Sequence, residues 1–206
     1  MLYIIFMPCR NIIKTYDSNS YYHIYNRGVE KRKIFIDDQD FATFENLLKR
    51  YLSDKPIKDS RGRNYIFLGD KVSLIAFCLM PNHFHMMIYQ TELDSITKLL
   101  RSVCSSYVTY FNNKYNRVGT LFQGNFKAIQ IKDESYLLFL TRYIHRNPAD
   151  YLEYEWSSLD YWLEKKNADW LDYEIICDMS PTEYLDFIND DREYYSGVDK
   201  ISKLLF

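Results

Sequence analysis

The feature that most constrains the fold is a pair of strand-like runs joined by a two-residue turn. The first run, VSLIAFCLM (72–80), is largely apolar, and the second, HFHMMIY (83–89), follows directly after Pro81-Asn82. Runs of this length and composition predict strands, and a Pro-Asn pair predicts a turn. The sequence therefore predicts an antiparallel hairpin over residues 72–89.

Other predicted elements flank this hairpin. Further strands are predicted at 20–27 (SYYHIYNR, ended by Gly28), 64–68 (NYIFL) and 121–131 (LFQGNFKAIQI). Helical spacing predicts helices starting near Asp38 or Asp40, from Asp94 to about Asn113, and from Asp133 to about Asn147, where Pro148 stops the last one. The order indicates an α+β fold, a ferredoxin-like antiparallel sheet with helices packed on one face.

The chain is expected to have three parts: an N-terminal segment (1–19), a main domain (20–150) and an acidic helical extension (151–206) packed against it. Beyond Pro148 the sequence becomes acidic and aromatic, and Ser180-Pro181 followed by Glu183 predicts a helix start. The extension could mask a binding face or shape a dimer, and the sequence does not choose between these roles.

Charge is unevenly distributed along the chain. The formal net charge of −2 argues, taken alone, against a nucleic-acid partner. However, residues 96–150 carry eight Lys/Arg against three Asp/Glu, whereas residues 151–206 carry five against fourteen. A basic middle is compatible with a local phosphate-binding face, although solvated helix faces can produce the same asymmetry.

The cysteines and the N-terminus bear on the cellular compartment. The four cysteines form no CxxC pair, which argues against a secreted disulfide framework and a zinc ribbon. The opening MLYIIFMPC is too short to span a bilayer and lacks the basic lead and cleavage site of a signal peptide. A cytoplasmic protein without a membrane partner is expected.

His83-Phe84-His85 is the sharpest local motif. Side chains alternate along a strand, so the two histidines point one way and Phe84 points into the core. Two neighbouring imidazoles form half of a site for a divalent ion. The alternative is that both are ordinary strand histidines, because such short patterns often arise by chance.

A second feature lies on the helix predicted at 133–147. Tyr143 and Asn147 are four residues apart and would share a helix face. A phenol and an amide oxygen could then approach one ion held by the two histidines, and a phenolate could attack a phosphate polarised by that ion. An amphipathic core helix with a surface asparagine explains the same spacing, and spacing alone does not exclude it.

Several longer segments resemble one family in the same order. The run MPNHFHMMI resembles the HUH motif of single-tyrosine transposases, and YYHIYNRGVEKRKIF resembles their opening strand. YFNNKYNRVGTLFQGNFKA is similar to the family's segment between helix and strand, and YLLFLTRYIHRNPAD to its catalytic helix. The resemblance covers roughly residues 20–150, and WSSLDYW is similar to a segment of repeat-associated members. Asn147 also favours that subgroup, because many insertion-sequence relatives have Gln there.

The resemblance implies a function and a site. It implies an enzyme that cuts and rejoins single-stranded or hairpin DNA through a 5′-phosphotyrosine on Tyr143, with Mg²⁺ or Mn²⁺ held by His83, His85 and Asn147. Relatives often act as homodimers, although some repeat-associated members look monomeric. Candidate phosphate contacts are Asn26, Arg27, Lys31, Arg32, Arg101, Arg117, Lys127, Arg142 and Arg146.

Alternatives remain at this point. The chain has 20 tyrosines, but Tyr107, Tyr110 and Tyr115 lack a ligand candidate four residues on in a helix aimed at the histidines. His23 and His145 are interpreted as structural. A non-catalytic nucleic-acid-binding module and a phosphodiesterase using metal and water are the rival functions; the second would leave Tyr143 dispensable.

The N-terminal residues also resemble those of the same family. Met7-Pro8-Cys9-Arg10 resembles the usual opening of family members, so Met7 is expected to be the natural start. Mass spectrometry of the protein expressed from its own promoter tests this expectation, and an intact peptide beginning at Met1 would contradict it.

Overall fold

A four-stranded antiparallel sheet forms the centre of the molecule. The computed structural model describes residues 16–190, so Met7 and the start expected there lie outside the described residues. The strands are β1 (Ser20–Arg27), β2 (Val72–Met80), β3 (His83–Gln90) and β4 (Lys127–Ile131), in the spatial order β2-β3-β1-β4. Every neighbouring pair is antiparallel. The α+β class, with the predicted hairpin inside the sheet, is confirmed.

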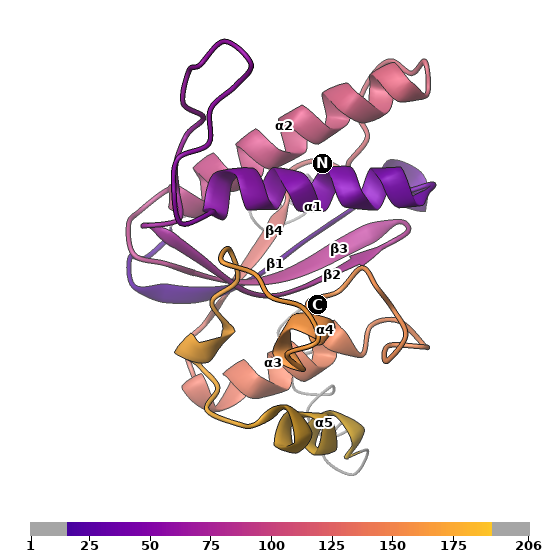
Figure 1. The fold of residues 1–206 in the computed structure, drawn as a ribbon. Coiled ribbons are helices and arrows are strands. Elements are labelled where there is room, and N and C mark those ends of the chain that lie inside the picture. The colour runs from indigo at the N-terminus through magenta and orange to yellow at the C-terminus, as the bar shows by residue number, and fades with distance from the viewer. Residues whose placement is uncertain (1–15, 191–206) are drawn as a thin grey trace, which may run out of the picture.

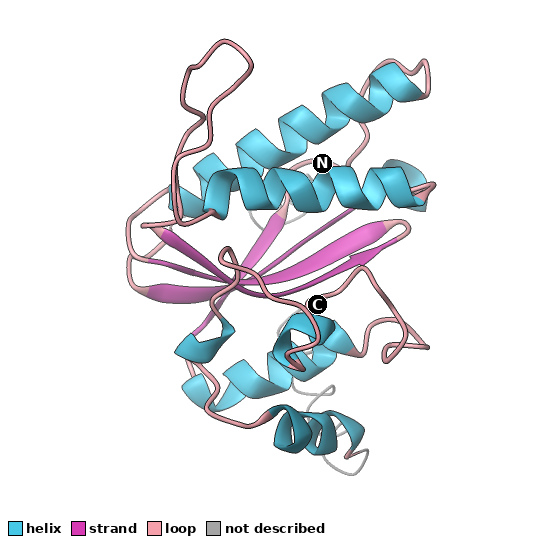
Figure 2. Cartoon of the chain, in the orientation of Figure 1, coloured by secondary structure: helices cyan, strands magenta, loops and turns pink. Residues whose placement is uncertain are grey.

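Helices cover both faces of this sheet, so the expectation that they pack on one face is wrong. Helices α1 (Asp38–Leu52) and α2 (Ser95–Lys114) lie on one face (Figure 1). Helices α3 (Leu137–His145), α4 (Leu159–Trp162) and α5 (Pro181–Asn189) lie on the other (Figure 2). Three short 3-10 helices complete the described elements: η1 (Val29–Lys31), η2 (Glu134–Tyr136) and η3 (Tyr173–Ile175).

The reason for two covered faces lies in β2 itself. Leu74 and Leu79 pack with α1 and α2 in one hydrophobic cluster. Ile75 and Cys78 pack with α3, α4 and α5 in a second cluster. A strand that is apolar on both faces is stable only when both faces are shielded from water.

Several elements differ from those predicted. NYIFL (64–68) is not a strand, because its backbone amides bond the loop and helix carbonyls of Ile57 and Tyr51. The last strand begins at Lys127, not Leu121, since Gly124 turns the chain with a φ of 71°. The first helix is capped by Asp37, not by Asp38 or Asp40.

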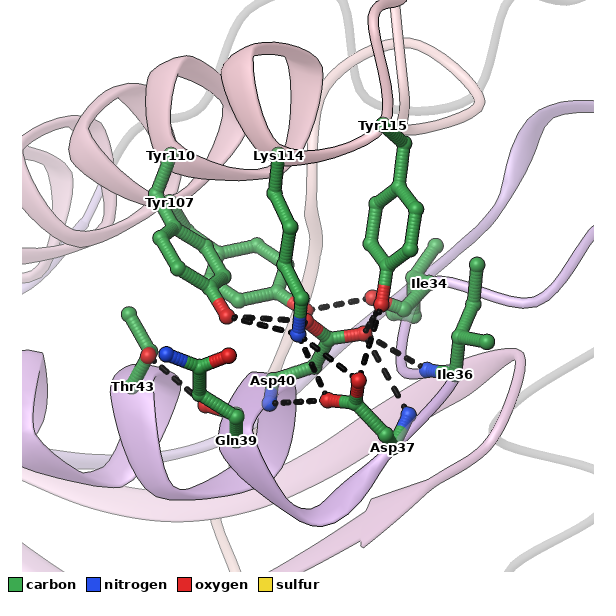
Figure 3. A network of polar contacts seen from close by, with 10 residues as sticks. All are labelled: Ile34, Ile36, Asp37, Gln39, Asp40, Thr43, Tyr107, Tyr110, Lys114 and Tyr115. Carbon is green, nitrogen blue, oxygen red and sulfur yellow. Dashed lines mark hydrogen bonds and ion pairs between the residues drawn. The ribbon is translucent and has the colours of Figure 1, made fainter.

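A polar network centred on the buried Asp40 ties α1 to the end of α2 (Figure 3). The Asp40 side chain is fully buried and accepts hydrogen bonds from the Ile36 amide at 2.8 Å and the Tyr115 hydroxyl at 2.8 Å. The Lys114 ammonium lies 2.9 Å from Asp40 and 2.7 Å from Asp37. These bonds hold the N-terminus of α1 against the C-terminus of α2.

The segment after α3 binds the outer strand of the sheet. The Tyr154 hydroxyl donates to the Leu79 carbonyl at 2.6 Å, and the Trp162 indole donates to the Ile75 carbonyl at 3.0 Å. The Ser158 hydroxyl accepts from the Phe77 amide at 2.8 Å. This segment therefore satisfies part of the edge of β2. Within residues 16–190, no helix is long and apolar enough to cross a membrane.

The start predicted for the last helix is confirmed. Ser180 caps α5, its side chain and that of Glu183 form a reciprocal capping box, and Pro181 occupies the first helical position. Tyr184 and Ile188 of this helix are buried in the second hydrophobic cluster.

Candidate functional site

The strand register assembles one polar row across the sheet. His85 of β3 pairs with Tyr25 of β1, which pairs in turn with Lys127 of β4. His83 pairs with Arg27 in the same way. Residues opposite each other in antiparallel strands point to the same face. All five side chains therefore project from the face that carries α3, whereas Phe84 lies in the core on the other face.

Helix α3 brings Tyr143 over this row. Its ring lies edge-on to that of His85, with centroids 5.5 Å apart, and to that of His23, with centroids 6.0 Å apart. The helix is held there because Leu137, Leu140 and Ile144 are buried against β2 and β3. The apolar spacing that predicted the helix thus also fixes which tyrosine faces the histidines.

Asn147 reaches the site from beyond the helix. Helix α3 ends at His145, so the prediction that the helix continues to Asn147 is wrong by two residues. The Asn147 amide donates to the Ile144 carbonyl, three residues back, at 3.3 Å. This 3-10-type hydrogen bond continues the chain for one more turn beyond the α-helix. Its side-chain Oδ1 lies 3.0 Å from Nε2 of His83.

A hydrogen bond between Nδ1 of His83 and the side chain of Asn82 orients the His83 ring. The Asn82 Nδ2 group donates to the Lys31 carbonyl at 3.4 Å, which leaves its Oδ1 facing Nδ1 of His83 at 2.6 Å. Oδ1 of Asn82 and Oδ1 of Asn147 both accept, so the neutral ring donates to only one of them, and donation from Nδ1 to Asn82 leaves a lone pair on Nε2. In that tautomer, Nε2 of His83 and Oδ1 of Asn147 are two acceptors that face one another, as two ligands of one cation would.

This donor set fits a divalent cation. Amide oxygen and neutral imidazole suit Mn²⁺, and Mg²⁺ takes oxygen ligands at about 2.1 Å, so that neighbouring ligands of one octahedral ion lie about 3 Å apart. The 3.0 Å between His83 and Asn147 matches that separation. No group of three or more His, Cys, Asp or Glu side chains able to hold a metal occurs within residues 16–190. A site here depends on the asparagine.

Burial keeps the three histidines of this face neutral. Burial lowers the pKa of His23 to about 3 and also lowers the pKa of His85, with the nearby His23 and His83 as smaller causes. Burial and the Arg27 charge lower the pKa of His83, against an opposing contribution from Asn147. Neutral imidazoles have the lone pairs that metal binding requires.

The other candidate tyrosines lie on the opposite face. The Tyr107 hydroxyl donates to the Ile34 carbonyl, and those of Tyr110 and Tyr115 donate to Asp40 (Figure 3). These three phenols belong to the structural network between α1 and α2. His145 is also structural, as expected, since its ring bonds the Tyr184 and Ser158 hydroxyls inside the second cluster.

Sequence reasoning missed three residues of the site. Tyr25 lies beside His85, with ring centroids 5.8 Å apart. His23 approaches Nδ1 of His85 at 2.9 Å, and Asn82 orients His83. Alternation along SYYHIYNR could have placed His23 and Tyr25 on one face, but only the pairing of β1 with β3 reveals that this face is the one with His85.

The candidate phosphate contacts fall into two groups. Arg27 and Lys127 share the face of the histidines, and Lys31 and Arg32 follow in and after η1. The others lie elsewhere or are engaged within the protein: Asn26 and Arg101 beside a 420 Å³ pocket next to α2, Arg117 on Asn112, and Arg142 and Arg146 on the carbonyls of Asp190 and Ile188. Arg142 is buried and stacks on Phe187, so it is not a surface contact for DNA.

Comparison with known proteins agrees with the resemblance read from the sequence. Residues 64–147, which include His83, His85, Tyr143 and Asn147, match the family described as "Transposase IS200 like". A solved REP-associated tyrosine transposase bound to a REP hairpin has a similar fold, with a TM-score of 0.54 and 12% identity over 82% of this chain and 94% of that chain. No curated protein matches. The predicted family resemblance is confirmed.

Proposed function

Because residues 64–147 match the IS200-like transposase family, we propose that this chain is a metal-dependent single-stranded DNA transesterase. In this proposal it cuts and rejoins DNA through a 5′-phosphotyrosine on Tyr143. The observation that carries the proposal is the convergence of His83 and His85 of β3, Tyr143 of α3, and Asn147 from the turn after α3. Tyr143 is the phenol that α3 sets against the histidines.

The residues divide the chemistry between them. The Tyr143 oxygen attacks the scissile phosphorus while its proton passes to solvent, and the bond from phosphorus to the 3′-oxygen breaks. The departing 3′-oxygen takes up a proton, and the reverse attack by a 3′-hydroxyl releases the tyrosine. His83, His85 and Asn147 would hold Mg²⁺ or Mn²⁺, which when bound neutralises charge on the phosphate. No activated water is needed, because the phosphotyrosine preserves the phosphodiester energy.

The proposed substrate is a DNA hairpin with short single-stranded flanks. The similar structure holds a REP hairpin, and Arg27 and Lys127 stand beside the site on the same sheet face in this chain. Positive side chains at such places contact the DNA backbone without reading its sequence. We place this activity in the cytoplasm, where the reduced Cys78, Cys104 and Cys177 are stable. A homodimer is compatible with the proposal and is not required by it.

Covalent capture tests the proposal. The full chain is incubated with Mn²⁺ and labelled hairpin DNAs whose single-stranded flanks are randomised, and the products are separated on a denaturing gel. We expect a labelled protein band in the wild type and none in Tyr143→Phe. Sequencing the captured DNA then identifies the target.

Tyr25→Phe is the matched control. It removes a second phenol from the same sheet face, near His85, and should leave the adduct in place. Cleavage without an adduct, unchanged in Tyr143→Phe, would support a water mechanism and contradict the proposal. Adduct formation that persists in Tyr143→Phe and disappears in Tyr25→Phe would move the nucleophile to Tyr25.

A further inference from the structure

His23 has an environment that a purely structural histidine would not be expected to have. It is buried in the middle of β1, and its Nε2 lies 2.9 Å from Nδ1 of His85. Its other ring nitrogen, Nδ1, is buried without a hydrogen-bond partner within residues 16–190. By contrast, both ring nitrogens of the structural His145 bond hydroxyls. An apolar side chain at position 23 would avoid the unpaired nitrogen.

The contact between the two rings limits where the protons can be. One of the two facing nitrogens must donate and the other accept, because both rings are neutral. If His23 donated from Nε2, His85 would carry its own proton on Nε2, and that nitrogen could not bind a cation. If His85 donates from Nδ1, its Nε2 presents a lone pair. The direction of one hydrogen bond thus decides whether His85 is a ligand.

We propose that His23 is a positioning residue that accepts the Nδ1 proton of His85 and thereby holds His85 in the tautomer that binds the metal through Nε2. This inference rests on the metal site of the proposed function. In the proposed state His23 keeps its own proton on Nδ1, the nitrogen that lacks a partner. Ligand histidines commonly donate their second ring nitrogen to such an acceptor.

The two ligand histidines are then held in parallel ways. Asn82 accepts the Nδ1 proton of His83, and its own direction is fixed by the Lys31 carbonyl. His23 performs the same task for His85 from the neighbouring strand, where the register of β1 on β3 sets His23 diagonally beside it. The acceptor of each ligand therefore comes from the protein rather than from solvent.

Metal affinity tests the inference without any DNA. Mn²⁺ alone is titrated into the full chain, and free Mn²⁺ is followed by electron paramagnetic resonance. His23→Phe keeps a ring but has no acceptor, and we expect Mn²⁺ affinity to fall about 10- to 100-fold. His23→Gln keeps an acceptor near the position of Nε2, and we expect its affinity to stay within a few-fold of the wild type.

A spectroscopic measurement covers the case in which His23→Phe fails to fold. In the Mg²⁺-loaded wild type, ¹⁵N-detected histidine spectra should show His23 protonated on Nδ1 and unprotonated on Nε2. A proton on Nε2 of His23 in that state would overturn the inference. So would unchanged Mn²⁺ affinity in a folded His23→Phe variant, or an equal loss in His23→Gln. A wild-type chain that binds no Mn²⁺ would instead overturn the proposed function on which the inference rests.

Discussion

At the scale of single residues, burial decides how each histidine behaves. All four histidines of the chain are neutral at physiological pH, because burial lowers their pKa values below the usual range. The hydrogen-bond partners of each histidine then indicate whether its role is structural or in the candidate site. His145 faces two hydroxyls and stabilises the second cluster, whereas His83 and His85 each have one ring nitrogen bonded from behind and lie next to Asn147 or Tyr143.

His145 should make the protein sensitive to acid. Burial lowers its pKa to about 3 in the folded state, against 6.5 in the unfolded chain. Above pH 6.5 the group is neutral in both states; below it only the unfolded chain gains the proton, so stability falls as the pH drops toward 3. Between pH 7 and pH 5 this group should cost about 2 kcal/mol.

Urea unfolding at pH 7 and pH 5 measures this loss. His145→Gln removes the titrating group, so the variant, although less stable at pH 7, should lose about 2 kcal/mol less than the wild type over the same interval. An equal loss in both proteins would show that the acid sensitivity arises elsewhere.

At the scale of the elements, caps and tertiary partners set the helix ends together. Three acidic residues, Asp37, Asp38 and Asp40, stand at the start of α1, and the sequence signal for a cap is shared among them. Asp37 caps the helix, while Asp40 closes the capping box and also meets Lys114 and Tyr115 of α2. The capping box and the packing of α2 together distinguish Asp40 from its exposed neighbour Asp38.

Asp40→Asn should therefore destabilise the fold. The substitution removes the charge that pairs with Lys114 and turns one acceptor into a donor facing other donors. We expect a loss of about 3 kcal/mol in the free energy of unfolding, measured by urea titration. Asp38→Asn is the control. Asp38 lies in the same first turn of α1 but is exposed, so this substitution should change stability by less than about 0.5 kcal/mol. Similar losses in both variants would contradict the role given to the network.

At the scale of the whole molecule, the two faces of the sheet carry different side chains. The face under α1 and α2 is filled by aromatic and aliphatic side chains, and the Asp40 network joins these two helices. The opposite face carries the histidines, Tyr25, Arg27 and Lys127 near the end of α3. A protein with a formal net charge of −2 can therefore still present positive side chains where a DNA strand would lie.

Two lysines on opposite faces provide a comparison. Lys127 lies on the histidine face, and Lys98 is exposed on α2 across the sheet. Lys127→Gln should weaken binding of hairpin DNA with single-stranded flanks several-fold and reduce the slope of log affinity against log salt by about 0.7. Lys98→Gln should leave both unchanged. Fluorescence anisotropy at several salt concentrations measures both quantities, and equal effects of the two variants would argue against a binding face beside the histidines.

Local signals in the sequence were enough for much of this description. Alternation in HFHMMIY placed His83 and His85 on one face, the Pro81-Asn82 turn placed the hairpin, and helical spacing placed α1, α2 and α3. These predictions succeed because side-chain periodicity and turn chemistry are properties of neighbouring residues. The same reasoning failed at 64–68 and 121–126, which make only one isolated bridge each, Asn64 with Lys58 and Phe122 with Gly28, and otherwise form loops.

What only the tertiary structure decided is which separate elements meet. The sequence by itself determined the class of fold, the histidine pair and the tyrosine–asparagine pair as candidates. It could not show that α3 lies on the face opposite α1, that Asn147 reaches His83 from beyond a helix end, or that His23 stands behind His85. Each of these depends on strand register and on which apolar face packs against which. Such contacts join residues up to 64 positions apart, so no local pattern encodes them.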